Sequence, residues 1–236
     1  MRKFNPEGHT AHQFDIELND VKNKVMNMGG LVESMVHNGL EALLTMNPEM
    51  GRQVSVDDHR ANQFELDIDE DCTRILARRQ PAASDLRLVL TIIKTISDLE
   101  RIGDEAEKLG RISVKLSGES DVPNYYKDLR HLGEHVKTML REALDAFTRM
   151  DVEAAFRTAA KDEAIDQEYG NISRLLISHM MENPRNVSHA LDMSWCARSL
   201  ERIADHACNI CEYVIYLVEG KDIRHANLDD MRKKLL

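Results

Sequence analysis

The sequence contains little of what turns, disulfide scaffolds and membrane spans are made from. It has 11 glycines, 5 prolines and 4 cysteines among 236 residues, and 5% of its residues are aromatic. Its longest stretch without a charged residue is the eight residues from Val25 to Val32, against roughly 20 for a membrane-spanning helix. The N-terminus becomes polar and acidic where a signal peptide would be apolar. These absences exclude collagen-like, disulfide-rich and membrane-spanning proteins.

The cysteines do not form a recognisable metal or disulfide motif. Cys72, Cys196, Cys208 and Cys211 lie within helical patterns. The spacing Cys208-x-x-Cys211 lacks the second pair of ligands that a zinc site needs, which favours small buried side chains. Without a signal peptide, we expect reduced thiols and a cytoplasmic protein.

Positive charge is also in deficit. The chain has 31 Lys and Arg against 41 Asp and Glu, a formal net charge of −10. Nucleic-acid-binding proteins normally have the opposite balance, and the pattern contains no short recognition helix. We therefore expect no nucleic-acid partner. Glycine-rich phosphate loops, HExxH and nucleophile motifs are missing as well.

What the sequence does contain is helical periodicity. Apolar residues recur at steps of three and four, in segments separated by Pro6, Pro48, Pro81, Pro123 and Pro184. Proline breaks helix interiors, so each marks a boundary. One further break is expected at Met150–Asp151. The predicted helices cover residues 9–46, 49–79, 82–117, 123–149, 152–182 and 185–219.

The chain also repeats itself. Val32–Asn47 aligns without gaps with Val136–Asp151, and Asp98–Leu109 aligns with Ser199–Ile210. The shared Leu-Glu-Arg-Ile-x-Asp-x-Ala and the colinear order argue for duplication of a three-helix unit. We predict an all-α protein made of two tandem three-helix bundles. The predicted segments are an N-terminal tail at 1–8, a first unit at 9–118, a second unit at 122–220 and a C-terminal tail at 221–236.

Each unit places acidic or amide pairs at one height of its hairpin of second and third helices. Each pair has i,i+4 spacing, which puts both side chains on one helix face. A cluster of oxygen ligands suits Mg²⁺, Mn²⁺ or iron. The candidate ligands are Asp58, Asn62, Glu100 and Asp104 in the first unit, and Asp162, Asp166, Glu201 and Asp205 in the second.

The alternative interpretation is that these residues line solvated helix faces and form salt bridges, as acidic helix faces commonly do. Two carboxylates roughly 5 Å apart repel by on the order of 3 kcal/mol at an effective dielectric constant of about 20. A cation, a proton, or the neighbouring Arg101 and Arg202 must offset that repulsion.

An arginine-rich turn stands out in this acidic chain. Arg74, Arg78, Arg79 and Arg87 surround the segment from Ala77 to Arg87. Basic residues at a helix C-terminus complement the helix dipole. A docking surface for a partner is the other interpretation, and the sequence does not decide between them.

The duplicated unit, the segments LERIGDEA and LERIADHA and the turn ARRQPAASDLR resemble the PhoU family of phosphate-uptake regulators. The resemblance covers about residues 9–220. It implies a cytoplasmic, usually dimeric, non-enzymatic negative regulator of the phosphate regulon. It also implies association with the ATPase of the phosphate-specific ABC transporter and with a membrane sensor histidine kinase, so that membrane contact is indirect.

The resemblance further implies that iron, manganese or magnesium, though not obligatory, binds at paired E/D-x-x-x-D motifs. Glu100/Asp104, Glu201/Asp205 and Asp162/Asp166 match that motif, whereas Asn62 in Asp58/Asn62 replaces an acid. An adaptor between transporter and kinase is the leading hypothesis. The alternative is a metal-dependent enzyme, either a di-metal oxidase or a phosphohydrolase, although the Glu-x-x-His spacing of ferritin-like bundles is missing.

Overall fold

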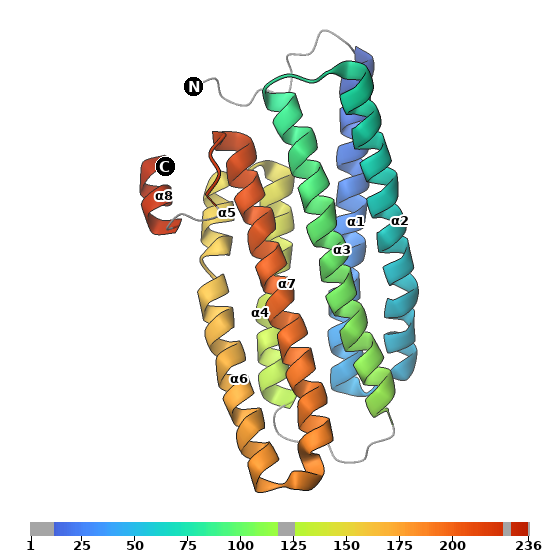
Figure 1. Cartoon of the computed structure of the whole chain (residues 1–236), viewed down its shortest axis with the longest axis vertical. Coiled ribbons are helices and arrows are strands. Elements are labelled where there is room, and N and C mark those ends of the chain that lie inside the picture. Colours follow the sequence, from blue (N-terminus) through green and yellow to red (C-terminus); the bar gives the residue numbers. More distant parts are fainter. Residues whose placement is uncertain (1–11, 118–125, 224–227, 236) are drawn as a thin grey trace.

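The computed structural model describes residues 12–117, 126–223 and 228–235, and within these ranges the regular elements are helices (Figure 1). A short 3₁₀ turn, Pro184–Asn186, precedes α7. The α-helices are α1 (His12–Thr45), α2 (Pro48–Arg79), α3 (Ser84–Leu116), α4 (Tyr126–Arg149), α5 (Val152–Ala159), α6 (Asp162–Glu182), α7 (Val187–Glu219) and α8 (Leu228–Leu235).

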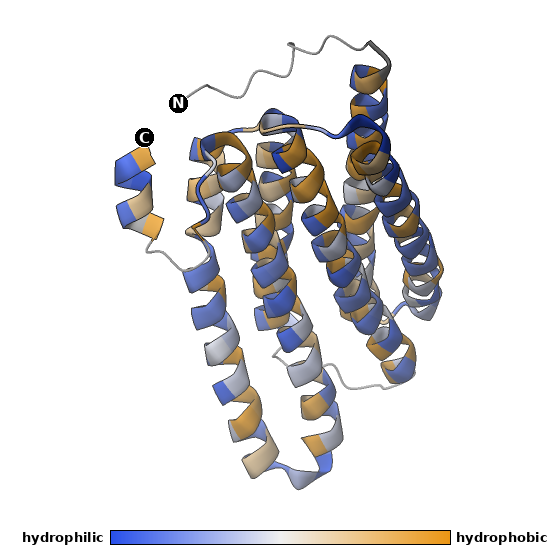
Figure 2. Cartoon of the chain, turned by 45° about the horizontal axis from the view of Figure 1, so that its top comes forward, coloured by the Kyte–Doolittle hydropathy of each residue, from blue (hydrophilic) through white to orange (hydrophobic). Residues whose placement is uncertain are grey.

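The helices form two antiparallel bundles that lie side by side. α1, α2 and α3 make the first, and α4, α5 with α6, and α7 make the second (Figure 1). Each helix turns its apolar stripe inward, as the orange faces in Figure 2 show. Val32, Leu99 and Ile102 in the first bundle and Val136, Leu200 and Ile203 in the second are fully buried. The predicted all-α fold of two three-helix bundles is confirmed.

Two details differ from the prediction. The fifth helix, expected without interruption over 152–182, is broken at Ala160 and Lys161 into α5 and α6. Ala160 N–H bonds to the Phe156 carbonyl while Lys161 N–H bonds to Thr158, so the hydrogen-bond ladder tightens there and α6 restarts with acidic Asp162. The expected C-terminal tail also contains α8. The predicted tail 1–8, the predicted helix starts at residues 9 and 123 and the predicted unit boundaries at 118 and 122 lie outside the described residues.

The two bundles meet along α1 with α4 and along α3 with α7, and the second runs in the opposite direction to the first (Figure 1). Contacts across each seam occur in two copies, and the two repeats exchange roles between the copies. A Cβ on Gly29 would lie 3.0 Å from Leu144 Cδ2, and one on Gly133 would lie 2.5 Å from Leu40 Cδ2. Gly29 aligns with Gly133, and Leu40 with Leu144. The repeats are therefore related by a local two-fold axis.

Two buried polar pairs between α3 and α7 show the same exchange of roles between the repeats. His206 Nδ1 lies 2.7 Å from Asp98 Oδ1, and Ser199 Oγ donates to Glu105 Oε2 at 2.8 Å. Asp98 aligns with Ser199, and Glu105 with His206. All four side chains are buried. Since buried polar groups are stable only when paired, these bonds fix the register of the seam.

None of the helices among the described residues is both long and apolar enough to cross a membrane. The four cysteines are free thiols, three of them buried and Cys208 half-buried. Burial raises the pKa of the Cys72 thiol to about 12, so it stays protonated and a poor metal ligand.

Candidate functional site

The acidic set of the second repeat gathers between α6 and α7. Asp166, Glu201 and Asp205 each offer a carboxylate oxygen, and the three oxygens lie within 4.8 Å of one another. Asp162 lies one turn before Asp166, at the start of α6, and is close enough for Asp205 and Asp166 to raise its pKa. The antiparallel α6–α7 pair, counted from its turn, thus brings the four predicted residues to one height.

Two oxygens of this cluster are buried without a hydrogen-bond partner among the described residues, Asp162 Oδ1 and Glu201 Oε2. Buried acceptors of this kind cost about 1–3 kcal/mol each when unpaired. The neighbouring cation is not the expected one: Arg198 Nη1 lies 3.2 Å from Glu201 Oε1, whereas Arg202 reaches across the seam to Glu105 at 3.0 Å. Arg202, one of the expected candidates for offsetting these charges, therefore has its direct contact with Glu105, and it acts on the cluster by lowering the pKa of Asp205.

Burial and mutual repulsion make these carboxyls weak acids. Burial raises the pKa of Asp162 to about 6, with Asp205 and Asp166 adding to the effect. The same two causes raise the pKa of Glu201 and of Asp205, partly countered by Arg198. A group of carboxyls that retains protons in this way is stabilised by whatever brings positive charge to it.

The first repeat has a looser and less charged cluster between α2 and α3. Asn62 Nδ2 donates to Asp58 Oδ2 at 3.4 Å, leaving both Oδ1 atoms buried without a partner among the described residues. Burial and repulsion by Asp104 raise the pKa of Asp58 and of Glu100. In the described chain these carboxylates do not form a group as tight as that of the second repeat.

Sequence reasoning missed one member of the first cluster. The pKa of Glu65 is raised by burial and by Asp69, and Glu65 in turn raises the pKa of Glu100. Glu65 lies one turn after Asn62, so helical spacing could have found it. The search relied on residues shared by both repeats, and the residue aligned with Glu65 is Tyr169.

The donor sets fit hard divalent cations. Both clusters are made of carboxylate and amide oxygens, which Mg²⁺ and Mn²⁺ prefer and iron accepts. Asp162 Oδ1 and Glu201 Oε2 have no hydrogen-bond donor among the described residues, and a cation bound to the cluster would supply positive charge beside them. At the four positions that the repeats share, the second cluster has an acid where the first has Asn62, and its carboxylate oxygens lie closer together, so it is the better ligand set.

The four arginines divide into different environments. Arg79 binds Glu17 of α1 through Nε at 3.0 Å and Nη2 at 2.7 Å, and Arg74 pairs with Asp71. Arg74 and Arg78 line a hollow between α1 and α2 together with Lys24. Arg87 lies elsewhere, on α3, where its guanidinium faces Gly220 at the end of α7. The structure thus groups Arg74 and Arg78, and separates Arg87 from them.

A second surface was missed by sequence reasoning. The far end of the α6–α7 hairpin exposes large apolar side chains, visible as orange at its lower end in Figure 2. We call it the apolar tip; its residues are Ile177, Met181, Val187, Leu191 and Trp195. Apolar residues at i,i+4 spacing are usually assigned to the core, which is why the pattern did not reveal it. Trp195 is the single tryptophan of the chain.

Comparison with known proteins agrees with the resemblance. The family model described as PhoU domain matches residues 25–113 and 129–214. A phosphate-specific transport system accessory protein PhoU homolog of Pseudomonas aeruginosa is 48% identical over 227 residues, covering 96% of this chain and 94% of the relative. The phosphate-specific transport system accessory protein PhoU of Escherichia coli is 42% identical over 235 residues, covering 100% and 97%.

Solved structures agree as well. A crystal structure of PhoU from Pseudomonas aeruginosa superposes with a TM-score of 0.87 at 50% identity, covering 89% of this chain and 100% of that one. A phosphate transport system regulatory protein PhoU from Streptococcus pneumoniae gives a TM-score of 0.82 at 32% identity, covering 89% and 99%.

Proposed function

The chain belongs to the PhoU family, and from that premise we propose that it is an accessory protein that regulates phosphate transport by binding other proteins. The observation that carries this proposal is the identity of 42–48% to accessory proteins of the phosphate-specific transport system over nearly the whole of both chains. Identity at that level extends over both bundles, so the proposal concerns the whole chain.

In its full form the proposal makes the protein a cytoplasmic homodimer that acts as an adaptor. It binds the ATPase of the phosphate-specific ABC transporter and the membrane sensor histidine kinase, and it keeps the kinase output low when phosphate is plentiful. It reaches the membrane only through these partners. Two surfaces support binding to proteins: the apolar tip, and the charged hollow between α1 and α2, where Lys24, Arg74 and Arg78 stand beside three acidic residues.

The apolar tip is the surface to test first, because exposed apolar clusters mark protein contacts. Leu191→Glu together with Met181→Glu is expected to weaken binding of the purified transporter ATPase by roughly tenfold or more. Trp195 reports on this surface alone, so a blue shift of its emission on adding the ATPase would place the contact there. The matched control is Leu66→Glu, an exposed leucine on α2 outside the tip.

The charged hollow gives a second, separate test. Arg78→Glu is expected to weaken capture of the kinase or the ATPase while helicity stays the same, because Arg78 lies at the end of α2 and is exposed. Co-purification from cells grown at high phosphate, followed by identification of bound proteins, tests the adaptor as a whole. Recovery of neither partner, or phosphoester turnover by the metal-loaded protein, would contradict it.

We propose in addition that the acidic clusters hold Mg²⁺, Mn²⁺ or iron, with the second cluster binding more tightly. The orphaned oxygens of Asp162 and Glu201 support this. Calorimetric titration with Mn²⁺ should lose the tighter site in the variant that combines Glu201→Ala and Asp205→Ala. Unchanged Mn²⁺ and iron binding in that variant would remove the second cluster as a metal site.

A further inference from the structure

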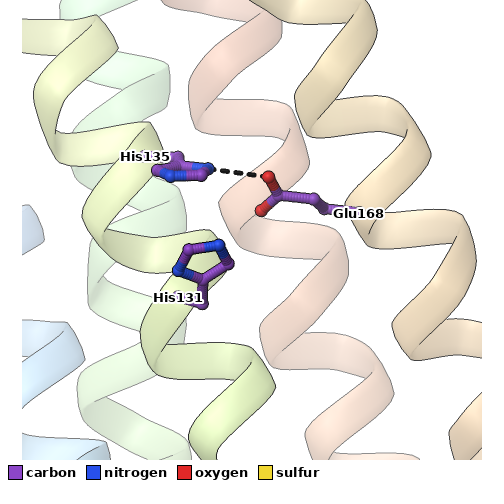
Figure 3. A group of neighbouring side chains, drawn as sticks. All are labelled: His131, His135 and Glu168. Carbon is purple, nitrogen blue, oxygen red and sulfur yellow. Dashed lines mark hydrogen bonds and ion pairs between the residues drawn. The ribbon is translucent and has the colours of Figure 1, made fainter.

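A third group of ligand-type side chains lies away from the acidic clusters, between α4 and α6. His131 and His135 stand one turn apart on α4, and Glu168 reaches toward them from α6 (Figure 3). Each offers one donor atom, and the three donor atoms lie within 4.8 Å of one another. The two imidazole rings have their centroids 4.3 Å apart. Both histidines are exposed, so the group is open to solvent.

The carboxylate of Glu168 is only half satisfied. Its Oε1 lies 2.7 Å from His135 Nδ1. Its Oε2 is buried and has no hydrogen-bond partner among the described residues. Figure 3 shows this second oxygen on the side of His131. A buried carboxylate oxygen without a donor is unfavourable, and a cation between Glu168 and His131 would supply what is missing.

We propose that His131, His135 and Glu168 bind a divalent transition metal of the zinc class. Two imidazoles and one carboxylate form a ligand set typical of zinc, and histidines at i,i+4 on one helix present their nitrogens to a common point. Imidazole also selects Zn²⁺, Co²⁺ or Ni²⁺ over Mg²⁺. Ligand atoms around tetrahedral zinc lie about 3.3 Å apart, so the exposed rings need only small rotations to reach that spacing.

The surroundings leave room for a fourth ligand. The hollow beside the group is lined by Asp128, one turn before His131, and by Asn171 and the apolar side chains of Ile172 and Leu175. Three protein ligands with an open position bind an exchangeable water or Asp128 in the remaining place.

This site belongs to the second repeat alone. The residues that the duplication aligns with His131, His135 and Glu168 are Asn27, Leu31 and Phe64, none of them a match for zinc. The ligand chemistry also differs from the all-oxygen clusters. Asp166 and Glu168 are two positions apart on α6 and therefore point to different sides of the helix.

Occupation of the site would join α4 directly to α6. In the second bundle these two helices pack mainly against α7. On their outer face, the described side chains join α4 to α6 through the contact between His135 and Glu168, which is an ion pair when His135 is protonated. A metal bound there would hold the helices together on the side that α7 does not cover.

The test is titration of the metal-stripped full-length protein with ZnCl₂, with millimolar Mg²⁺ present to occupy the acidic clusters. We expect one Zn²⁺ per chain, weakened roughly tenfold or more by His131→Ala or by His135→Ala. Co²⁺ should give visible absorption bands characteristic of four or five ligands, and both variants should lose them. Zn²⁺ should also raise the melting temperature of the wild-type protein and not of the variants.

Two controls decide the outcome. His179→Ala removes a histidine that lies on α6 outside the group, and this variant should bind Zn²⁺ as the wild-type protein does. Asp166→Asn alters the acidic cluster and should leave the Zn²⁺ site intact. Wild-type Zn²⁺ affinity in the variant combining His131→Ala with His135→Ala would overturn the proposal, as would loss of the Zn²⁺ site in Asp166→Asn.

Discussion

The turn between the first and second helices is built in the same way in both repeats. Met46 and Met150 each have a φ of 53°, and the next residue in each case caps the following helix. Asn47 accepts from the amides of Glu49 and Met50, and Asp151 accepts from Ala154. The shared turn shows that duplication preserved the backbone. The differences between the repeats therefore lie in what the helices do after it.

One difference is how closely the helices approach beyond the turn. In the first repeat, a Cβ on Gly51 would lie 2.5 Å from the Gly110 carbonyl oxygen, so α2 and α3 are nearly in backbone contact. The aligned residues in the second repeat are Ala155 and Cys211, both buried. The crossing of α5 and α7 therefore accommodates two side chains where the first repeat has none, and α5 ends four residues after Ala155.

The other difference is charge. Asn62 of the first cluster corresponds to Asp166 of the second, so an amide takes the place of a carboxylate at that shared position. The first repeat is thus closely packed with an amide at one shared ligand position, and the second is interrupted beside a cluster with acids at all four shared positions. In the second repeat the middle helix is interrupted directly before Asp162, the first residue of its acidic cluster.

Exchanging the close crossing should have the largest effect. Gly51→Ala places a methyl group against backbone that cannot rotate away, and we expect a loss of about 2–3 kcal/mol of unfolding free energy despite the better helix propensity of alanine. Urea unfolding measures this. The reverse change in the second repeat, Ala155→Gly, should cost about 1 kcal/mol. Equal effects of the two changes would contradict the difference in packing.

Exchanging the charge should come next. Asp166→Asn gives the second cluster the composition of the first, and we expect its Mn²⁺ affinity to fall roughly tenfold, which is about 1.4 kcal/mol. Asn62→Asp should strengthen Mn²⁺ binding in the first repeat for the same reason. Calorimetric titration follows both. If Asn62→Asp leaves Mn²⁺ binding unchanged, the charge difference does not set the affinity.

The raised pKa of Asp162 predicts a pH dependence in the metal-free protein. The carboxyl holds its proton more tightly in the folded protein, with a pKa of about 6 against an ordinary value of 3.8. The contribution of this carboxyl to the free energy of unfolding is therefore fully present at low pH and is lost as the pH rises from about 4 to above 6. For this half-buried group we expect about 1 kcal/mol after allowing for solvent screening.

Urea unfolding in EDTA at about pH 5 and about pH 7.5 measures the part of this contribution that is lost above pH 5. Asp162→Asn should reduce the difference between the two conditions, because asparagine does not titrate. Added Mn²⁺ should increase the free energy of unfolding more at the higher pH, because the cation binds the ionised carboxylate. A larger pH difference in Asp162→Asn would rule out the assignment.

The smallest effects are expected from removing the helix N-caps Asn47 and Asp151, and salt should distinguish the two. Asn47→Ala and Asp151→Ala should each cost about 0.5–1 kcal/mol of unfolding free energy. Asp151 additionally places a negative charge at a helix N-terminus, which salt screens. Melting temperatures at low and high salt should therefore show salt dependence for the loss at Asp151 and little for the loss at Asn47.

Much of the fold follows from local pattern. Proline positions and apolar periodicity located the helices, and the offset between repeats located the acidic pairs at one height. The break at Ala160–Lys161 did not follow, because both residues favour helix and no proline or glycine marks the place. What accompanies the break is a contact between helices that local pattern does not contain: Lys161 Nζ donates to both carboxylate oxygens of Glu142 on α4 at 2.6 Å.

Contacts between helices were harder to foresee. The pairing of Arg202 with Glu105 depends on the rotation of α7 against α3, which periodicity within one helix does not contain. The approach of Glu168 to His135 joins residues 33 positions apart and has no counterpart in the other repeat. Comparison of the two repeats predicts only features that both repeats share, and the Glu168–His135 contact occurs in one repeat alone.

The exchanged pairs across the α3–α7 seam also have a consequence for how the chain folds. The His206–Asp98 and Ser199–Glu105 contacts close loops of 108 and 94 residues, far longer than the connections within either repeat. Closing such loops is entropically expensive, and contacts at this separation form late. Each repeat can therefore collapse early around its own short connections, with docking of the two halves as the slower, final step of folding.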